Sequence, residues 1–98
     1  MPISEKNTLT LCPSGNGGCV PNKDPWDCDP GRVQIINNTQ VTQELTNVTN
    51  GVLAPAPQKT VSVPTTGWTG TAGSKKGTYI YDDGLPVAGP RTGTIDPS

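Results

Sequence analysis

The chain has 98 residues, of which 31% are hydrophobic, with two Trp, two Tyr and no Phe, so a single domain with a small core is expected. Its 7 basic and 8 acidic residues give a net charge of −1 without a basic cluster larger than Lys75-Lys76, which excludes a nucleic-acid-binding surface. No apolar run approaches the roughly 20 residues that span a bilayer, and residues 1–20 lack a signal-peptide pattern. We therefore expect a soluble chain without membrane insertion, for example at a virion or extracellular surface.

Three cysteines, Cys12, Cys19 and Cys28, lie in the first third of the chain. In an oxidising compartment they would give one disulfide and one leftover thiol, and in a reducing cytosol three thiols. If a bond forms, we expect it to join Cys12 or Cys19 to Cys28, because it would close a glycine-rich loop that little else holds. The wide spacing and the absence of histidine argue against a zinc site.

Alternation of polar and apolar residues predicts short strands along most of the chain. The predicted strands are Thr8–Leu11, Gly31–Thr39 with its end at the Asn37-Asn38 turn, Lys59–Pro64 closed by the proline, Gly77–Tyr81 and Arg91–Ile95.

Three further segments give weaker signals. Residues 40–50 carry apolar residues at helical spacing but lack a cap and helix-forming composition, so we interpret them as a strand that ends at the Asn50-Gly51 turn. Residues 53–58 are predicted to be an extended, proline-containing connector. Residues 66–76 hold Trp68 among glycines and threonines and are predicted to be a loop or an irregular edge strand.

Strands separated by turn signals about every 8–12 residues predict an all-β fold, a small antiparallel Greek-key β-sandwich of about six or seven short strands with Pro/Gly-rich loops. The single domain 1–98 is divided into an N-terminal strand with a Cys/Pro/Gly-rich loop (1–30), a core sandwich (31–95) and a tail (96–98). Tyr79 and Tyr81 are expected on one face of their strand and Ile80 on the other.

Several motifs follow one another in a distinctive order over about residues 31–95. They are Gly31-x-Val33-x-Ile35-Ile36-Asn37-Asn38, a proline-containing connector, Thr60-Val61-Ser62-Val63, Gly77-Thr78-Tyr79-Ile80-Tyr81 and Gly93-Thr94-Ile95. This order resembles the cupredoxin-like domains, the small copper β-sandwiches of the plastocyanin and azurin type. Apart from an initial strand, the first thirty residues have no clear counterpart.

The copper site of that family does not carry over. Blue copper requires two imidazoles and a thiolate, usually with a weak axial Met, whereas this chain has no His and its one methionine is Met1. By position, Gln43 stands about where the family's first histidine would be, and Asp83 about where its cysteine would be. The resemblance therefore implies the fold without a cofactor, and Gln43 with Asp82 or Asp83 is interpreted as a polar loop cluster and a candidate binding group.

Trp26 and Trp68 are the other binding candidates. Trp26 lies in a short loop, where an indole either covers one end of the core or offers an exposed platform to a ligand. Asp24, Asp27 and Asp29 in the same loop are weak candidates for Ca²⁺, and solvated turn aspartates are the simpler interpretation.

Catalysis is not expected from this sequence. Without histidine there is no Ser-His pair and no imidazole base, and a cysteine nucleophile would lack its usual partner. We predict a non-enzymatic structural or assembly module, such as a virion decoration or surface-lattice subunit, that associates with a protein partner or with itself. The alternative is a soluble module that recognises a protein or a glycan, and a redox or metal protein ranks behind both.

Overall fold

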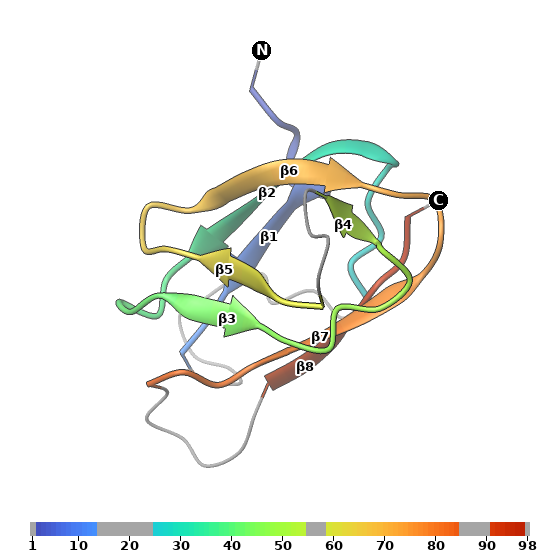
Figure 1. Cartoon of the computed structure of the whole chain (residues 1–98). Helices are drawn as coiled ribbons and strands as arrows, with labels where there is room; N and C mark the ends of the chain where they lie inside the picture. Colours follow the sequence, from blue (N-terminus) through green and yellow to red (C-terminus); the bar gives the residue numbers. More distant parts are fainter. Residues whose placement is uncertain (1, 14–24, 55–58, 85–90, 98) are drawn as a thin grey trace.

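The computed structural model describes residues 2–13, 25–54, 59–84 and 91–97, and these residues fold mainly into strands (Figure 1). Within those ranges the elements are η1 (Glu5–Asn7), β1 (Thr8–Leu11), β2 (Gly31–Asn37), β3 (Gln43–Leu45), β4 (Leu53–Ala54), β5 (Val61–Val63), β6 (Trp68–Ala72), β7 (Gly77–Tyr81) and β8 (Arg91–Ile95). The predicted all-β class is confirmed. None of the helical structure in these ranges has the length and apolar character needed to cross a membrane.

The first sheet has the strand order β1-β2-β6-β4. β1 runs parallel to β2, with Leu9 opposite Ile35, while β6 is antiparallel to both of its neighbours. Parallel neighbours need a connection that leaves the sheet and returns to it. Part of this connection reaches the other side of the molecule, because Trp26 forms a parallel bridge with Ile95 of β8.

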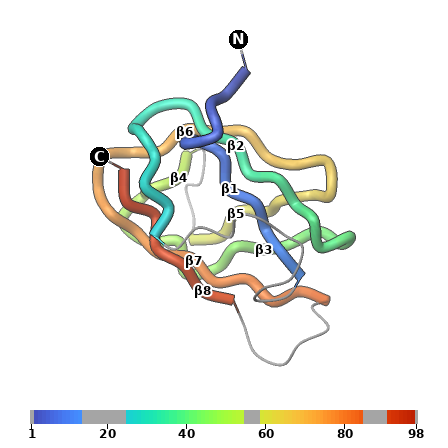
Figure 2. The backbone as a smooth tube through the Cα atoms, turned by 180° about the vertical axis from the view of Figure 1, so that it is seen from behind, coloured from blue at the N-terminus to red at the C-terminus, as the bar shows by residue number. Residues whose placement is uncertain are grey.

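The remaining strands form a second row. β3 pairs with β5, and β7 pairs with β8, in both cases antiparallel. Thr46 and Ile80 join the two pairs through backbone hydrogen bonds of 2.7 and 2.8 Å, which gives the order β5-β3-β7-β8. In Figure 1 the strands β3, β7 and β8 lie below β6 and β4, and Figure 2 shows the same separation from behind.

The core lies between the first sheet and this row. Val61 and Val63 are buried while Ser62 between them is exposed, as the alternation predicts. Tyr79 and Tyr81 are each 1% exposed and their rings are stacked with centroids 6.1 Å apart. Buried side chains from both rows therefore make one continuous core, as expected for strands that each present one apolar face.

The hydroxyl group of Tyr81 ties β7 to the end of β1. It accepts a hydrogen bond from the backbone N–H of Cys12 at 3.1 Å and donates one to the Cys12 carbonyl oxygen at 3.3 Å. The group is buried, so these two bonds satisfy a hydroxyl that would otherwise be costly to remove from water.

The segment around Trp68 differs from the prediction. β6 is a regular strand with a neighbour on each side, neither a loop nor an edge strand. The alternation signal is weak because the inward positions are Trp68, Gly70 and Ala72. Gly70 is needed there, since the six-membered ring of Trp68 and the carbonyl oxygen of Ala54 occupy the place where its Cβ would be.

The structure also adjusts the boundaries of two segments. The strand expected within residues 40–50 is confined to β3, and the connector expected from residue 53 begins as β4; residues 55–58 lie outside the described ranges. The turn at Asn50-Gly51 is confirmed: these residues have φ values of 58° and 60°, and the N–H of Val52 donates to the carbonyl oxygen of Thr49 at 3.2 Å.

Candidate functional site

Gln43 and Asp83 lie side by side where β3 begins and β7 has ended. Gln43 is 0% exposed, and its Nε2 donates to the carbonyl oxygen of Asp83 at 2.6 Å. In return the backbone N–H of Asp83 donates to Gln43 Oε1 at 3.0 Å. The structure thus brings together the two positions at which the resemblance would place metal ligands.

Two further residues extend these hydrogen bonds into the protein. Gln43 Nε2 also donates to Thr39 Oγ1 at 2.7 Å, and Asn37 Oδ1 accepts from the Thr39 backbone N–H at 2.8 Å. Asn37 Nδ2 donates to the carbonyl oxygens of Val41 and Val63 at 2.7 and 2.9 Å. We refer to Asn37, Thr39, Gln43 and Asp83 as the polar pole.

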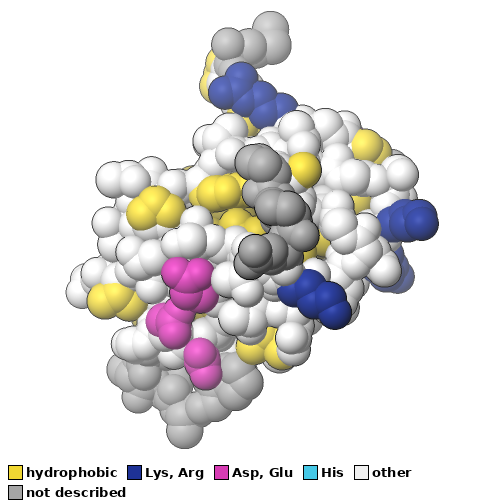
Figure 3. Space-filling view, viewed as in Figure 1, with side chains coloured by type: hydrophobic (Ala, Val, Ile, Leu, Met, Phe, Trp, Pro, Cys, Tyr) yellow, Lys and Arg dark blue, Asp and Glu magenta, His cyan; other side chains and the backbone are white. Residues whose placement is uncertain are grey.

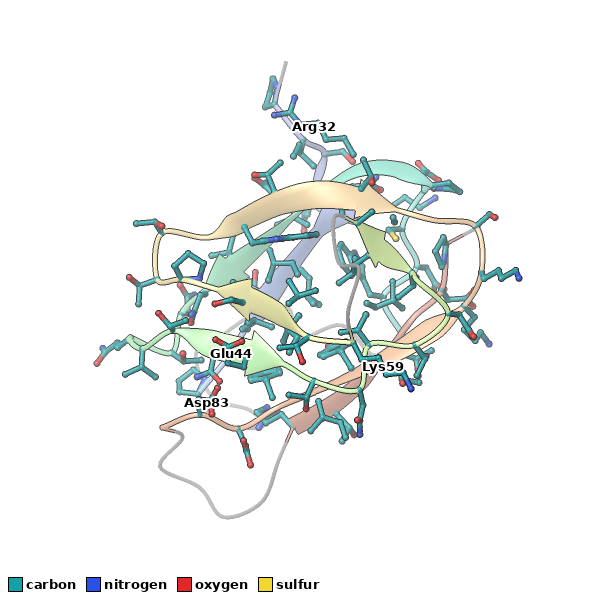
Figure 4. The ribbon with its side chains drawn as sticks, in the orientation of Figure 1. Arg32, Glu44, Lys59 and Asp83 are labelled. Atoms are coloured by element: carbon teal, nitrogen blue, oxygen red, sulfur yellow. The ribbon has the colours of Figure 1, made fainter. Side chains whose placement is uncertain are left out.

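The carboxylate of Asp83 points to the outside of the polar pole. Its Oδ2 accepts from the backbone N–H of Glu44 at 2.8 Å, and Figure 4 shows both side chains at the same end of β3. Acidic side chains gather on this part of the surface (Figure 3). Asp82, the other candidate here, is exposed, and the hydrogen bonds of the Gln43 side chain are made with Thr39 and Asp83.

The amide groups of the polar pole are fully hydrogen-bonded, and the polar pole has none of the donors that select copper. Its amide groups use both donor hydrogens and the carbonyl oxygen on protein partners, so they are already satisfied. It offers neither a thiolate nor an imidazole, the donors that select copper. Across the described ranges, no group of three or more His, Cys, Asp or Glu side chains is close enough to hold a metal ion.

Trp26 is a core residue, and its interpretation as an exposed binding platform is wrong. The side chain is 0% exposed, and its Nε1 donates to the carbonyl oxygen of Lys6 at 2.9 Å. Its backbone N–H donates to Thr94 at 2.8 Å, and its carbonyl oxygen accepts from Asp96 at 2.9 Å. Backbone pairing beside β8 therefore places the indole at one end of the core, which is the covering role expected of a tryptophan in so short a loop.

Trp68 is partly buried and lines a hollow of about 160 Å³. The wall of this hollow is formed by Gln34, Ile35, Ile36, Asn37, Thr65, Thr66, Gly67, Trp68 and Thr69. Sequence reasoning singled out Trp68 but missed the hollow. The available signal was the turn sequence Pro64-Thr65-Thr66-Gly67 directly before Trp68.

Of the three aspartates of the first loop, one has protein partners, one is exposed, and one lies outside the described part of the chain. The carboxylate of Asp29 forms an exposed salt bridge with Lys6 Nζ at 2.8 Å, and this hydrogen bond raises the pKa of Lys6. Asn7 holds the backbone of Asp29 through its Oδ1 and Nδ2 at 2.9 and 3.1 Å. Asp27 is exposed, and Asp24 is among the residues that are not described.

The cysteines do not pair as expected. Cys12 is disulfide-bonded, but Cys28 is a buried free thiol, so a bond from either of the other cysteines to Cys28 is ruled out. Cys19 lies outside the described residues. Cys28 is 0% exposed and belongs to the core cluster, where a free cysteine packs as a small apolar residue. The expected pairing followed from the loop that a bond to Cys28 would close, and this criterion does not predict which cysteine is buried in the core.

This arrangement predicts a definite labelling pattern. In the native protein Cys28 should react slowly with iodoacetamide, because its burial removes access and raises the pKa of its thiol. In urea without reductant Cys28 should become alkylated, whereas Cys12 should require a reductant. Peptide mass spectrometry separates the two sites, and alkylation of Cys12 before reduction would contradict the assignment.

Comparison with protein-family models, with curated proteins and with solved structures finds no match to this chain.

Proposed function

We propose that this chain is a non-enzymatic structural or assembly module with a metal-free, cupredoxin-like Greek-key sandwich. The observation that carries the proposal is the polar pole. There Gln43 and Asp83 satisfy each other through two hydrogen bonds, at the positions that the resemblance makes equivalent to the family's metal ligands. A pole closed by its own hydrogen bonds stabilises a fixed shape and leaves no open position for a metal.

The strand connections support the sandwich. The chain passes from β2 in the first sheet to β3 in the second row, and it changes sides again at β4, β5, β6 and β7. Repeated crossing between two layers is typical of Greek-key sandwiches. The connection between the parallel strands β1 and β2 also crosses to the second row, because Trp26 within this connection forms a bridge with Ile95 of β8.

The surface of the first sheet supports an assembly role. Its outer face, which we define by side chains that alternate with the buried ones, carries Thr8, Gln34, Ile36, Thr69 and Thr71, with Arg32 opposite Thr71. Arg32 is the one charged residue among these six, so a neighbouring subunit can cover most of the face without removing an ion from water. The assemblies that fit are those in which a small rigid subunit covers a larger surface, such as a virion coat or a surface lattice.

Size-exclusion chromatography with light scattering tests the assembly role. At high concentration we expect a mass above that of the 10.2 kDa monomer, because the outer face pairs with another copy. Thr71→Lys, which places a second positive charge opposite Arg32 on that face, should shift the protein toward the monomer, whereas Thr92→Lys at an exposed position of β8 should not. A strict monomer at every concentration would count against self-assembly, and stoichiometric copper in the purified protein would overturn the metal-free proposal.

Recognition of a protein or a glycan is the second candidate function. The hollow beside Trp68 favours it, because concave sites with a few polar groups are where small ligands bind.

A further inference from the structure

We propose that the hollow beside Trp68 binds one neutral sugar ring. This inference gives a ligand class to the recognition role, the second candidate function, and it competes with self-assembly through the outer face, because Gln34, Ile36 and Thr69 of that face line the hollow. It rests on the position of the hollow on the sheet, on the fixed geometry of its rim, and on the absence of charge from its wall.

The hollow opens on the outer face of the first sheet. Ile36 is 41% exposed, and it alternates with the buried Ile35 and Asn37, so its side chain points away from the core. Gln34 and Thr69 are opposite each other on β2 and β6 and belong to the same face. An exposed aliphatic surface beside an amide and a hydroxyl group matches a sugar ring, which has C–H groups on its faces and hydroxyl groups around its edge.

The rim of the hollow is held in place by backbone geometry. The N–H of Gly67 donates to the carbonyl oxygen of Pro64 at 2.9 Å, which closes the turn that carries Thr65 and Thr66. Gly67 has φ of 96°, and a Cβ at this position would come within 3.1 Å of the Ile35 carbonyl oxygen. Glycine therefore lets the turn approach β2 and seats two hydroxyl groups beside the hollow.

Other hydrogen bonds orient two more polar groups of the wall. Gln34 Nε2 donates to Thr8 Oγ1 at 2.9 Å, so the amide is oriented and its Oε1 can accept from a ligand hydroxyl. Asn37 is also fixed, but its amide is already satisfied within the polar pole, so Gln34 is the one of these two that can contact a ligand. Such prior ordering lowers the entropy cost of binding a small ligand.

The charge and size of the hollow narrow the choice of ligand. None of the nine residues of the wall is charged, and an ionic ligand would lose hydration without gaining a partner. A volume of about 160 Å³ is close to that of an engineered cavity of roughly 150 Å³ that holds benzene, so the hollow has room for a single ring and not for several.

A peptide strand is a poorer fit to this position. β2 lies between β1 and β6, and its backbone groups pair with both neighbours. An added strand needs a free sheet edge, which the hollow does not provide. A ligand here must be recognised through side chains, as a sugar ring is.

Two-dimensional ¹H–¹⁵N NMR of the full chain tests the proposal with the methyl glycosides of glucose, galactose, mannose and N-acetylglucosamine. At least one glycoside should cause saturating shifts of the Ile36, Thr66 and Thr69 amides, with a Kd on the order of 1 mM, as a single ring with few contacts permits. Sodium glucuronate at the same concentrations should leave these amides unshifted.

Two matched variants test the aliphatic surface. Ile36→Ser should weaken binding about tenfold, as loss of a small apolar contact does. Val41→Ser should leave the affinity unchanged, because Val41 is also 41% exposed but does not line the hollow. The dispersion of the NMR spectrum shows whether each variant is folded.

Three results would overturn the proposal. The first is no saturating shift from any glycoside at about 100 times the expected Kd. The second is equal loss of binding in both variants, or equal binding of glucuronate. The third is that the same amides shift with protein concentration alone, which would assign the hollow to a second copy of the chain. If light scattering shows an oligomer and the titration fails, the sugar-binding proposal is wrong and the assembly proposal is retained.

Discussion

Trp26→Ala is expected to lower the free energy of unfolding by about 3–5 kcal/mol, the usual cost of removing a buried aromatic side chain. Trp26 is 0% exposed, belongs to the core cluster and loses the bond from its Nε1 to Lys6 when it is truncated. Small domains have a total stability of about 5–15 kcal/mol, so the variant should be near the limit of folding. Urea unfolding followed by far-ultraviolet circular dichroism measures the change.

The second tryptophan provides the comparison. Trp68 is only partly buried, so Trp68→Ala should cost about half as much as the substitution at Trp26. Trp26→Phe should fall between wild type and Trp26→Ala, because it keeps most of the buried ring and loses the donor. An equal loss from Trp26→Ala and Trp68→Ala would contradict the assigned burial of the two indoles.

Gln43→Leu is expected to lower the free energy of unfolding by about 2–4 kcal/mol although it preserves the approximate size of the side chain. The leucine would leave the backbone N–H of Asp83 without its acceptor and would remove the donor from Thr39. Polar groups that lose their partners inside a protein cost more than the net value of the bonds themselves. Urea unfolding, with NMR to confirm the fold, measures the loss.

Gln40 offers the matched control. It is exposed and lies just before the strand that begins at Gln43, so Gln40→Leu repeats the chemical change outside the polar pole. This variant should stay within about 0.5 kcal/mol of wild type. A similar effect at both positions would mean that the hydrogen bonds of the polar pole do not stabilise the fold.

Strong alternation made most of the strands predictable. In β5 and β7 the valines and tyrosines fall on every second residue, and the core uses one face of each strand. β6 was harder because its inward positions include Gly70, which has no side chain, so the apolar half of the alternation is interrupted. Tertiary packing of Trp68 over the glycine determines that strand, and a local pattern does not contain this information.

The candidate sites were predictable to different degrees. The resemblance led to Gln43 and Asp83 as equivalent positions, and the structure joins them by hydrogen bonds. It gave no indication of Asn37 or Thr39, whose roles depend on how the chain turns after β2. The hollow was not predictable either, because its wall combines β2 with a turn about thirty residues further along the chain.

The arrangement of β1 also determines how the subunit would respond to a pulling force. β1 follows directly after the N-terminal residues, lies parallel to β2 over four residue pairs, and is fixed at its far end by the hydroxyl of Tyr81 on Cys12. Tension applied along β1 through the N-terminus would slide it lengthwise over β2, so the hydrogen bonds between the strands would bear the load together and not break one after another. For a subunit tethered to a lattice by this end, the parallel pair would be the mechanical clamp of the molecule.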